Sequence, residues 1–135
     1  MILAKEIYKL VRNYLVAGGI DAYSDKIPDV MVYPFIMWEV LDGEQAPDTA
    51  FGVDLETITV RFNFFGNLIN PSDVMALMNG IEELFNTTTD LELVDTTGGK
   101  HLICNQKVGE TLRYLEENYY WQGIQDYTFK VQRDL

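Results

Sequence analysis

The stretch Val53–Phe64, VDLETITVRFNF, decides the fold because its apolar and polar residues alternate along most of its length. Successive side chains of a β-strand point to opposite faces, so this alternation predicts a strand with one buried and one polar face. A core is therefore expected to form on one side of this strand. The buried side would hold Ile58, Val60, Phe62 and Phe64, and the polar side Thr57, Thr59, Arg61 and Asn63.

A second stretch that favours a strand, Val30–Leu41, precedes this one and is dense in Val, Ile, Phe, Tyr and Trp. Pro34 lacks a backbone donor, so we expect the strand to begin or bend near it. Between the two stretches, Asp42–Phe51 holds Gly43, Pro47 and three acidic residues, which predicts an exposed loop. Two strands around an acidic loop indicate a long hairpin.

Two amphipathic helices are predicted, one on each side of this hairpin. Apolar residues recur every three or four positions from Ile2 to Leu15, and Gly18-Gly19 would end the helix because glycine accepts the left-handed conformation. We expect the following segment, Asp21–Asp29, to be a connecting loop. Asn70-Pro71-Ser72-Asp73 predicts the second start, since Asn caps free amides and Pro fits the first turn. The second helix would bury Val74, Leu77, Met78, Ile81, Leu84 and Phe85.

The C-terminal third is expected to complete the sheet. Four apolar residues flank the turn-forming segment Thr96–Gly99 and indicate a second hairpin: Leu91, Leu93, Leu102 and Cys104. Residues 107–118 fit both a helix and an extended path, and we favour a strand. In the last strand, 121–131, we expect one slip near Asp126. The residues expected to point inward there are Ile124, Tyr127, Phe129 and Val131.

The order of helix, two strands, helix and three or four strands predicts an α+β fold in a single domain spanning residues 1–135. We expect a mostly antiparallel sheet with a long hairpin, covered on one face by the two helices. The opposite face of the sheet must then be polar or meet a partner.

Charge and composition narrow the classes of function. The chain has 21 acidic and 10 basic residues and a net charge of −11, so neither a phosphate-binding surface nor adhesion to an anionic membrane is expected. No apolar stretch approaches the ~20 residues that span a bilayer. The first 16 residues lack a signal-peptide core, and we expect synthesis in the cytoplasm. One cysteine and one histidine exclude an internal disulfide and the common zinc arrays, and no cofactor is expected.

The sequence contains no evident catalytic set. His101 and Cys104 lie three residues apart, and in a strand such positions point to opposite faces, so a nucleophilic pair is not expected. Because carboxylate pairs are defined in space rather than by spacing, a carboxylate-dependent hydrolase stays an alternative to a non-enzymatic role. Five acidic residues near the hairpin tip lack the spacing of a calcium loop and predict a solvated loop or a contact with a basic partner: Asp42, Glu44, Asp48, Asp54 and Glu56.

The layout resembles the tail-terminator family, the tail-completion or head-tail joining proteins of long-tailed bacteriophages. The matching pieces are the opening helix from Ile2, the Val32-Tyr33-Pro34 strand, the strand Thr57–Phe64, the capped helix Pro71–Phe85 and the closing strand Gly123–Val131. The resemblance implies a structural virion protein, assembled in the host bacterial cytoplasm, that forms a ring, usually a hexamer, at the head-proximal end of the tail tube.

Such a ring would stop polymerisation of the tube and join the tail to the head connector, with DNA passing through its lumen. The implied partners are further copies of the chain, the tail tube protein and the head-completion or connector protein. An acidic lumen would repel DNA from the wall and let it slide without specific binding. Neighbouring copies could add strands to each other's exposed sheet edges, because a subunit contact that closes by rotation forms a ring.

Contact residues are expected in two places. Glu44, Gln45 and Asp48 are candidates in the 42–51 loop. Tyr119, Tyr120 and Trp121 are candidates because Tyr and Trp are enriched in subunit contacts, with core packing as the alternative for these rings. The alternative function is a monomeric acidic adaptor that binds a basic protein through the 42–51 loop.

Overall fold

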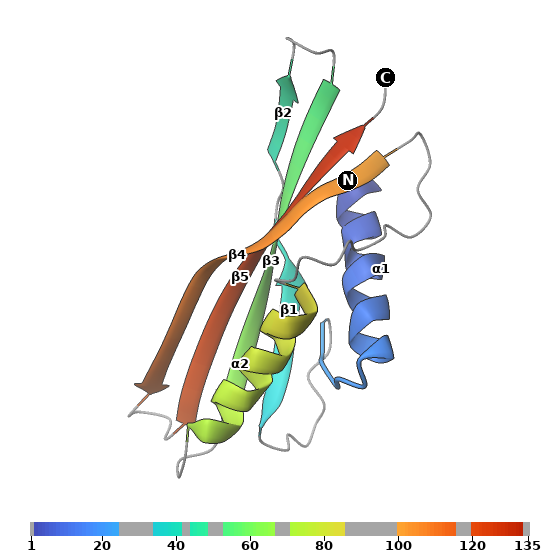
Figure 1. The fold of residues 1–135 in the computed structure, drawn as a ribbon. Helices are drawn as coiled ribbons and strands as arrows, with labels where there is room; N and C mark the ends of the chain where they lie inside the picture. Colours follow the sequence, from blue (N-terminus) through green and yellow to red (C-terminus); the bar gives the residue numbers. More distant parts are fainter. Residues whose placement is uncertain are drawn as a thin grey trace.

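The computed structural model describes residues 2–24, 34–41, 44–48, 53–66, 71–85, 100–115 and 120–133. All pairs of named strands are antiparallel, and the two helices lie over the sheet (Figure 1). The elements follow in the order α1 (Ile2–Ala17), β1 (Phe35–Val40), β2 (Glu44–Asp48), β3 (Val53–Gly66), α2 (Ser72–Phe85), β4 (Lys100–Leu115) and β5 (Tyr120–Arg133).

Strand β3 organises the sheet. One of its edges pairs with β5 from Asp54↔Arg133 to Gly66↔Trp121 without a register shift. The other edge is shared, since residues 60–65 pair with β1 and residues 53–57 pair with β2. Strand β4 lies beyond β5, so the order across the sheet is β1-β3-β5-β4, with β2 following β1 along the same edge of β3.

The core lies between one face of the sheet and both helices. The four alternating residues of β3 predicted to be buried are all completely buried. Leu77 and Leu84 pack against the core but are only partly buried. This arrangement confirms the α+β class, with an antiparallel sheet covered on one face by two helices. The helices contribute Ile7, Leu10, Val11 and Leu15 from α1, and Val74, Met78, Ile81 and Phe85 from α2.

Two glycines allow α2 to approach the sheet closely. A Cβ atom added at Gly66 would overlap Val74 Cγ2, and one added at Gly123 would lie 2.5 Å from Met78 Sδ. These positions therefore set the distance between α2 and strands β3 and β5, because a branched valine has little freedom to move aside.

The predicted end of α1 at Gly18-Gly19 is confirmed. Gly19 has a φ of 69°, and the amide of Ile20 donates to the carbonyl of Leu15 at 2.9 Å, as expected for a helix that ends on a left-handed glycine. The chain then meets β1, because the Tyr23 amide donates to the Ile36 carbonyl and the Tyr23 carbonyl accepts from Trp38, both at 2.9 Å. No helix in the described part of the chain is long and apolar enough to cross a membrane.

The expectation of a loop over residues 42–51 is wrong for residues 44–48, which form β2 and lengthen the hairpin. The physical reason is that β3 extends beyond the end of β1 and leaves backbone groups at 53–57 that need partners. Pro47 sits opposite Asp54 in this pairing, and an edge strand tolerates the missing donor.

The expected slip in β5 is also wrong. The register with β3 is unbroken, so Gly123, Gln125, Tyr127 and Phe129 face the helices, while Ile124 lies on the opposite face. The irregularities belong to β4, between Leu102 and Cys104 and between Lys107 and Gly109. The prediction of a strand from residue 107 is confirmed as far as residue 115, because β4 includes these residues. The predicted turn at 96–99 lies outside the described residues.

The first irregularity changes the placement of His101 and Cys104. These residues pair with Gln132 and Lys130, which are two residues apart on β5, so their register positions share one face instead of opposing ones. Their side chains lie outside the described part of the structure, and no pair is inferred from them.

Candidate interaction surfaces

The sheet face that carries no helix, named here the open face, is mainly polar. Arg61 on β3 and Asp126 on β5 occupy directly paired positions, with Nε to Oδ1 at 2.8 Å and Nη2 to Oδ2 at 3.1 Å. A two-pronged contact of this kind fixes both side chains across the strands. Around this pair the open face carries Thr57, Thr59, Asn63, Gln122, Thr128 and Lys130.

The charges of the open face are nearly balanced, in contrast with the net charge of −11 for the chain. Three basic and four acidic residues occupy its register positions on the five strands: Arg61, Arg113, Lys130, Glu39, Glu44, Asp48 and Asp126. The excess of acidic residues is therefore carried by other parts of the molecule, which argues against the open face as a strongly acidic wall.

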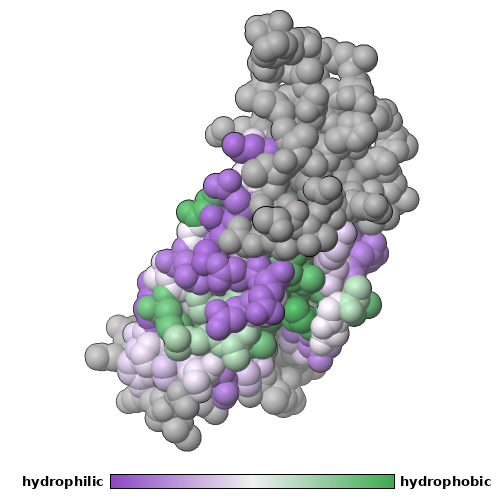
Figure 2. Space-filling model, in the orientation of Figure 1, coloured by the Kyte–Doolittle hydropathy of each residue, from purple (hydrophilic) through white to green (hydrophobic). Residues whose placement is uncertain are grey.

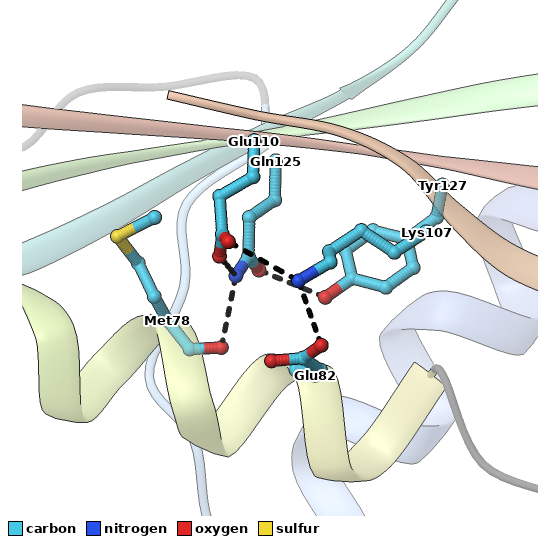
Figure 3. Close-up of polar contacts among 6 residues, drawn as sticks. All are labelled: Met78, Glu82, Lys107, Glu110, Gln125 and Tyr127. Atoms are coloured by element: carbon cyan, nitrogen blue, oxygen red, sulfur yellow. Dashed lines mark hydrogen bonds and ion pairs between the residues drawn. The ribbon is translucent and has the colours of Figure 1, made fainter. Parts of the chain in front are cut away.

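A buried polar network links α2 to β4 and β5 (Figure 3). The fully buried Gln125 donates from Nε2 to Glu110 Oε1 at 2.8 Å and to the Met78 carbonyl at 3.2 Å. Its Oε1 accepts a hydrogen bond from the Tyr127 hydroxyl at 2.8 Å. Burial, with the charges of Glu82 and Glu110, raises the pKa of Tyr127, so the hydroxyl stays a donor at neutral pH.

Lys107 closes the network on its outer side. Its Nζ lies 2.7 Å from Glu82 Oε1 on α2 and 3.2 Å from Glu110 Oε2 on β4. The contact with Glu82, followed by that with Glu110, raises the pKa of Lys107, while the hydrogen bond from Gln125 is the main cause of the lowered pKa of Glu110. The helix and the edge strand are thus joined by one ammonium group between two carboxylates.

This pair of carboxylates bears on the hydrolase alternative. Glu82 and Glu110 do share a partly exposed position, but Lys107 lies between them. A general acid needs a carboxyl group with a raised pKa, and the pKa of Glu110 is lowered instead. The arrangement is therefore better suited to holding α2 on β4 than to proton transfer.

A groove of about 320 Å³ opens beside the network, between α2 and β4. Met75 and Leu112 are 49% and 36% exposed, unusually accessible for large apolar side chains. The groove therefore combines apolar side chains with one charged side chain of the network, that of Glu110. Its lining consists of Met75, Met78, Asn79, Glu110 and Leu112.

The structure does not bring the predicted contact residues together. Glu44, Gln45 and Asp48 lie on β2, opposite residues 53–57 of β3, and their side chains are outside the described part. Tyr120 begins β5 opposite Leu115, Tyr119 is not described, and Trp121 pairs with Gly66 at the other end of β3. Trp121 is half-buried against the core with its ring centroid 5.3 Å from that of Tyr114, which favours the core-packing alternative for this residue.

The lowered pKa of Glu110 predicts a contribution to acid sensitivity. Below about pH 4.5 the unfolded chain binds this proton before the folded chain does, so part of the stability is lost as the pH falls through the folded pKa. We expect Glu110→Gln to make the fall in unfolding free energy shallower in this range, measured by urea denaturation at a series of pH values. Glu39→Gln, at an exposed position of β1, is the control; an equal flattening there would contradict the assignment to Glu110.

No protein-family model matches the sequence, and no curated protein is similar to it. Among solved structures, a chain from the virion of a native gene transfer agent particle superposes with a TM-score of 0.72 at 13% sequence identity. The alignment covers 96% of this chain and 94% of that chain. The two chains share a fold.

Proposed function

We propose that this chain is a structural protein of a phage-related virion, and more specifically a tail terminator. The observation that carries this proposal is the fold shared over nearly the full length with a chain of a gene transfer agent virion. The order of elements that resembles the tail-terminator family is consistent with it. In this role, copies of the chain form a ring at the head-proximal end of the tail tube, end its polymerisation and connect it to the head.

The two lateral edges of the sheet support assembly into a ring. β4 forms one edge, and within the described residues no strand pairs with its outer side. β1 and β2 form the other edge, where Tyr23 already bonds to β1 at Ile36 and Trp38. A contact between these unlike edges is heterologous, so repetition by rotation closes a ring rather than stopping at a dimer. The nearly balanced charge of the open face would let DNA pass through such a ring without specific binding.

The test of this proposal is the assembly state of the purified full chain and its effect on tail tubes. Native mass spectrometry and electron microscopy are expected to show one closed oligomer. It should be a hexamer if the ring is like those of the tail-terminator family. Added to polymerising tail tube protein, the ring should bind one tube end and stop elongation. A chain that stays monomeric up to hundreds of micromolar, or rings that leave tube growth unchanged, would contradict the proposal.

The adaptor alternative predicts a monomer that binds a basic protein through residues 42–51. No described contact favours it, since residues 44–48 form β2. The same measurement separates the two functions, because the adaptor requires no self-association.

A further inference from the structure

The outer flank of α1 combines a positive charge with exposed apolar surface. Arg12 and Val16 lie one helical turn apart on this flank, and Val16 is 73% exposed. The Arg12 guanidinium lies 5.9 Å from the ring centroid of Tyr8, which stacks on Trp38 of β1. The Tyr8 hydroxyl also lies 2.8 Å from Ser24 Oγ. We use the name α1 flank for Arg12, Val16 and Tyr23, the last of which is 37% exposed beside Ser24.

The surface around the groove between α2 and β4 has the opposite charge, and Glu110 is the charged residue that lines the groove itself. Three carboxylates, from Glu82, Glu83 and Glu110, stand against the single ammonium group of Lys107 along α2 and β4. Glu83 is exposed and lies one helical turn beyond Asn79, which lines the groove, so its charge is accessible on the helix beside the groove. The exposed Met75 side chain supplies an apolar surface beside these charges.

The two helices also differ in net charge over their whole length, since α1 is basic and α2 is acidic. The α1 sequence holds three basic residues and one acidic residue, whereas the α2 sequence holds three acidic residues and none that is basic. In a chain with a net charge of −11, a contact between unlike helices is the one that reduces repulsion between copies.

The two surfaces lie on opposite sides of the molecule. α1 packs over β1 and β3, and α2 packs over β3, β5 and β4 (Figure 1). Figure 2 shows hydrophobic side chains toward α2 and β4 on the left and toward α1 on the right, with a hydrophilic band between them. A contact that brings the right side of one copy to the left side of the next repeats in the same sense around a ring.

We propose that the α1 flank of one copy seats in the α2–β4 groove of its neighbour. Arg12 meets the carboxylates of Glu83 and Glu110, and Val16 and Tyr23 cover Met75 and Leu112. The same arrangement brings the β4 edge of one copy beside the β1 side of the next, so the helix and sheet contacts are compatible. This inference rests on the proposed ring and names the surfaces that form it.

The test is a charge exchange in the full chain, with the concentration of half-assembly measured by sedimentation. Arg12→Glu and Glu83→Arg are each expected to raise that concentration at least tenfold, and the double variant to return it to within about threefold of wild type. Met75→Glu should weaken assembly in the same way, because it places a charge among the apolar side chains of the groove. Circular dichroism confirms that each variant is folded. Lys130→Glu on the open face is the matched control and should leave assembly unchanged.

Each result separates the inference from the function on which it rests. If the wild type forms rings and neither Arg12→Glu nor Met75→Glu weakens them, the docking inference is wrong while the ring stands. An effect of Lys130→Glu as large as that of Arg12→Glu would mean that net charge alone controls assembly, and would also overturn the inference. If the wild type never assembles, the proposed function itself fails.

Discussion

Replacement of Phe62 by alanine is expected to lower the free energy of unfolding by about 3–5 kcal/mol, the range for removal of a buried aromatic side chain. Phe62 is completely buried and touches rings from three other elements. Its ring centroid lies 5.4 Å from that of Phe85 on α2, 5.6 Å from Tyr127 on β5 and 6.4 Å from Trp38 on β1. The cavity left by alanine would therefore loosen the contact between α2 and the sheet, and urea unfolding followed by circular dichroism measures the loss.

The matched control is Phe65→Ala, which removes the same side chain from the opposite face of the same strand. Phe65 is half-buried and stacks on Phe35 with ring centroids 4.9 Å apart. We expect a loss of about 1–2 kcal/mol there, because less apolar surface is withdrawn from water. Equal losses at the two positions would contradict the assignment of the core to the helix-covered face.

Alternation along β3 allowed the core to be predicted from the sequence. Side chains of a strand alternate between its two faces, and residues 57, 59, 61 and 63 are all polar. Only the other face of the strand could therefore be the buried one. The capped start of α2 and the glycine end of α1 were equally local signals, since each depends on a few neighbouring residues.

Strand β2 could not be predicted in the same way. Glu44, Pro47 and Asp48 have low strand propensity, and their pairing comes from the backbone of β3, which needs partners beyond the end of β1. Glu44 and Asp48 are contact candidates on the expectation of a charged loop, and the structure places both in a strand. Propensity describes the segment alone, whereas the pairing depends on a partner strand.

Gln125 is the residue that sequence patterning misplaced most clearly. The sequence predicts a slip near Asp126 because Ile124 and Tyr127 share a face only if the period of two is broken between them. The structure instead keeps the register and buries Gln125, with every polar atom of its side chain bonded. Its partners come from α2, β4 and β5, and no local pattern specifies a network assembled from three elements. The groove between α2 and β4 could not be predicted from the sequence either, because its lining residues come from two elements that are far apart in the chain.

Replacement of Gln125 by leucine is expected to cost about 2–3 kcal/mol in unfolding free energy. The substitution keeps an apolar volume in place but leaves the buried Tyr127 hydroxyl without its acceptor and removes one of the two donors to Glu110. If the cost comes from the orphaned hydroxyl, Tyr127→Phe in the Gln125→Leu background should recover about 1 kcal/mol, whereas Tyr127→Phe alone should destabilise the wild type. Gln122→Leu, on the open face, is the control and should change stability by less than about 1 kcal/mol. A double variant no more stable than Gln125→Leu would show that lost packing, and not the unpaired hydroxyl, determines the cost. Recovery would instead show that Gln125 is needed at this buried position as the acceptor of the Tyr127 hydroxyl.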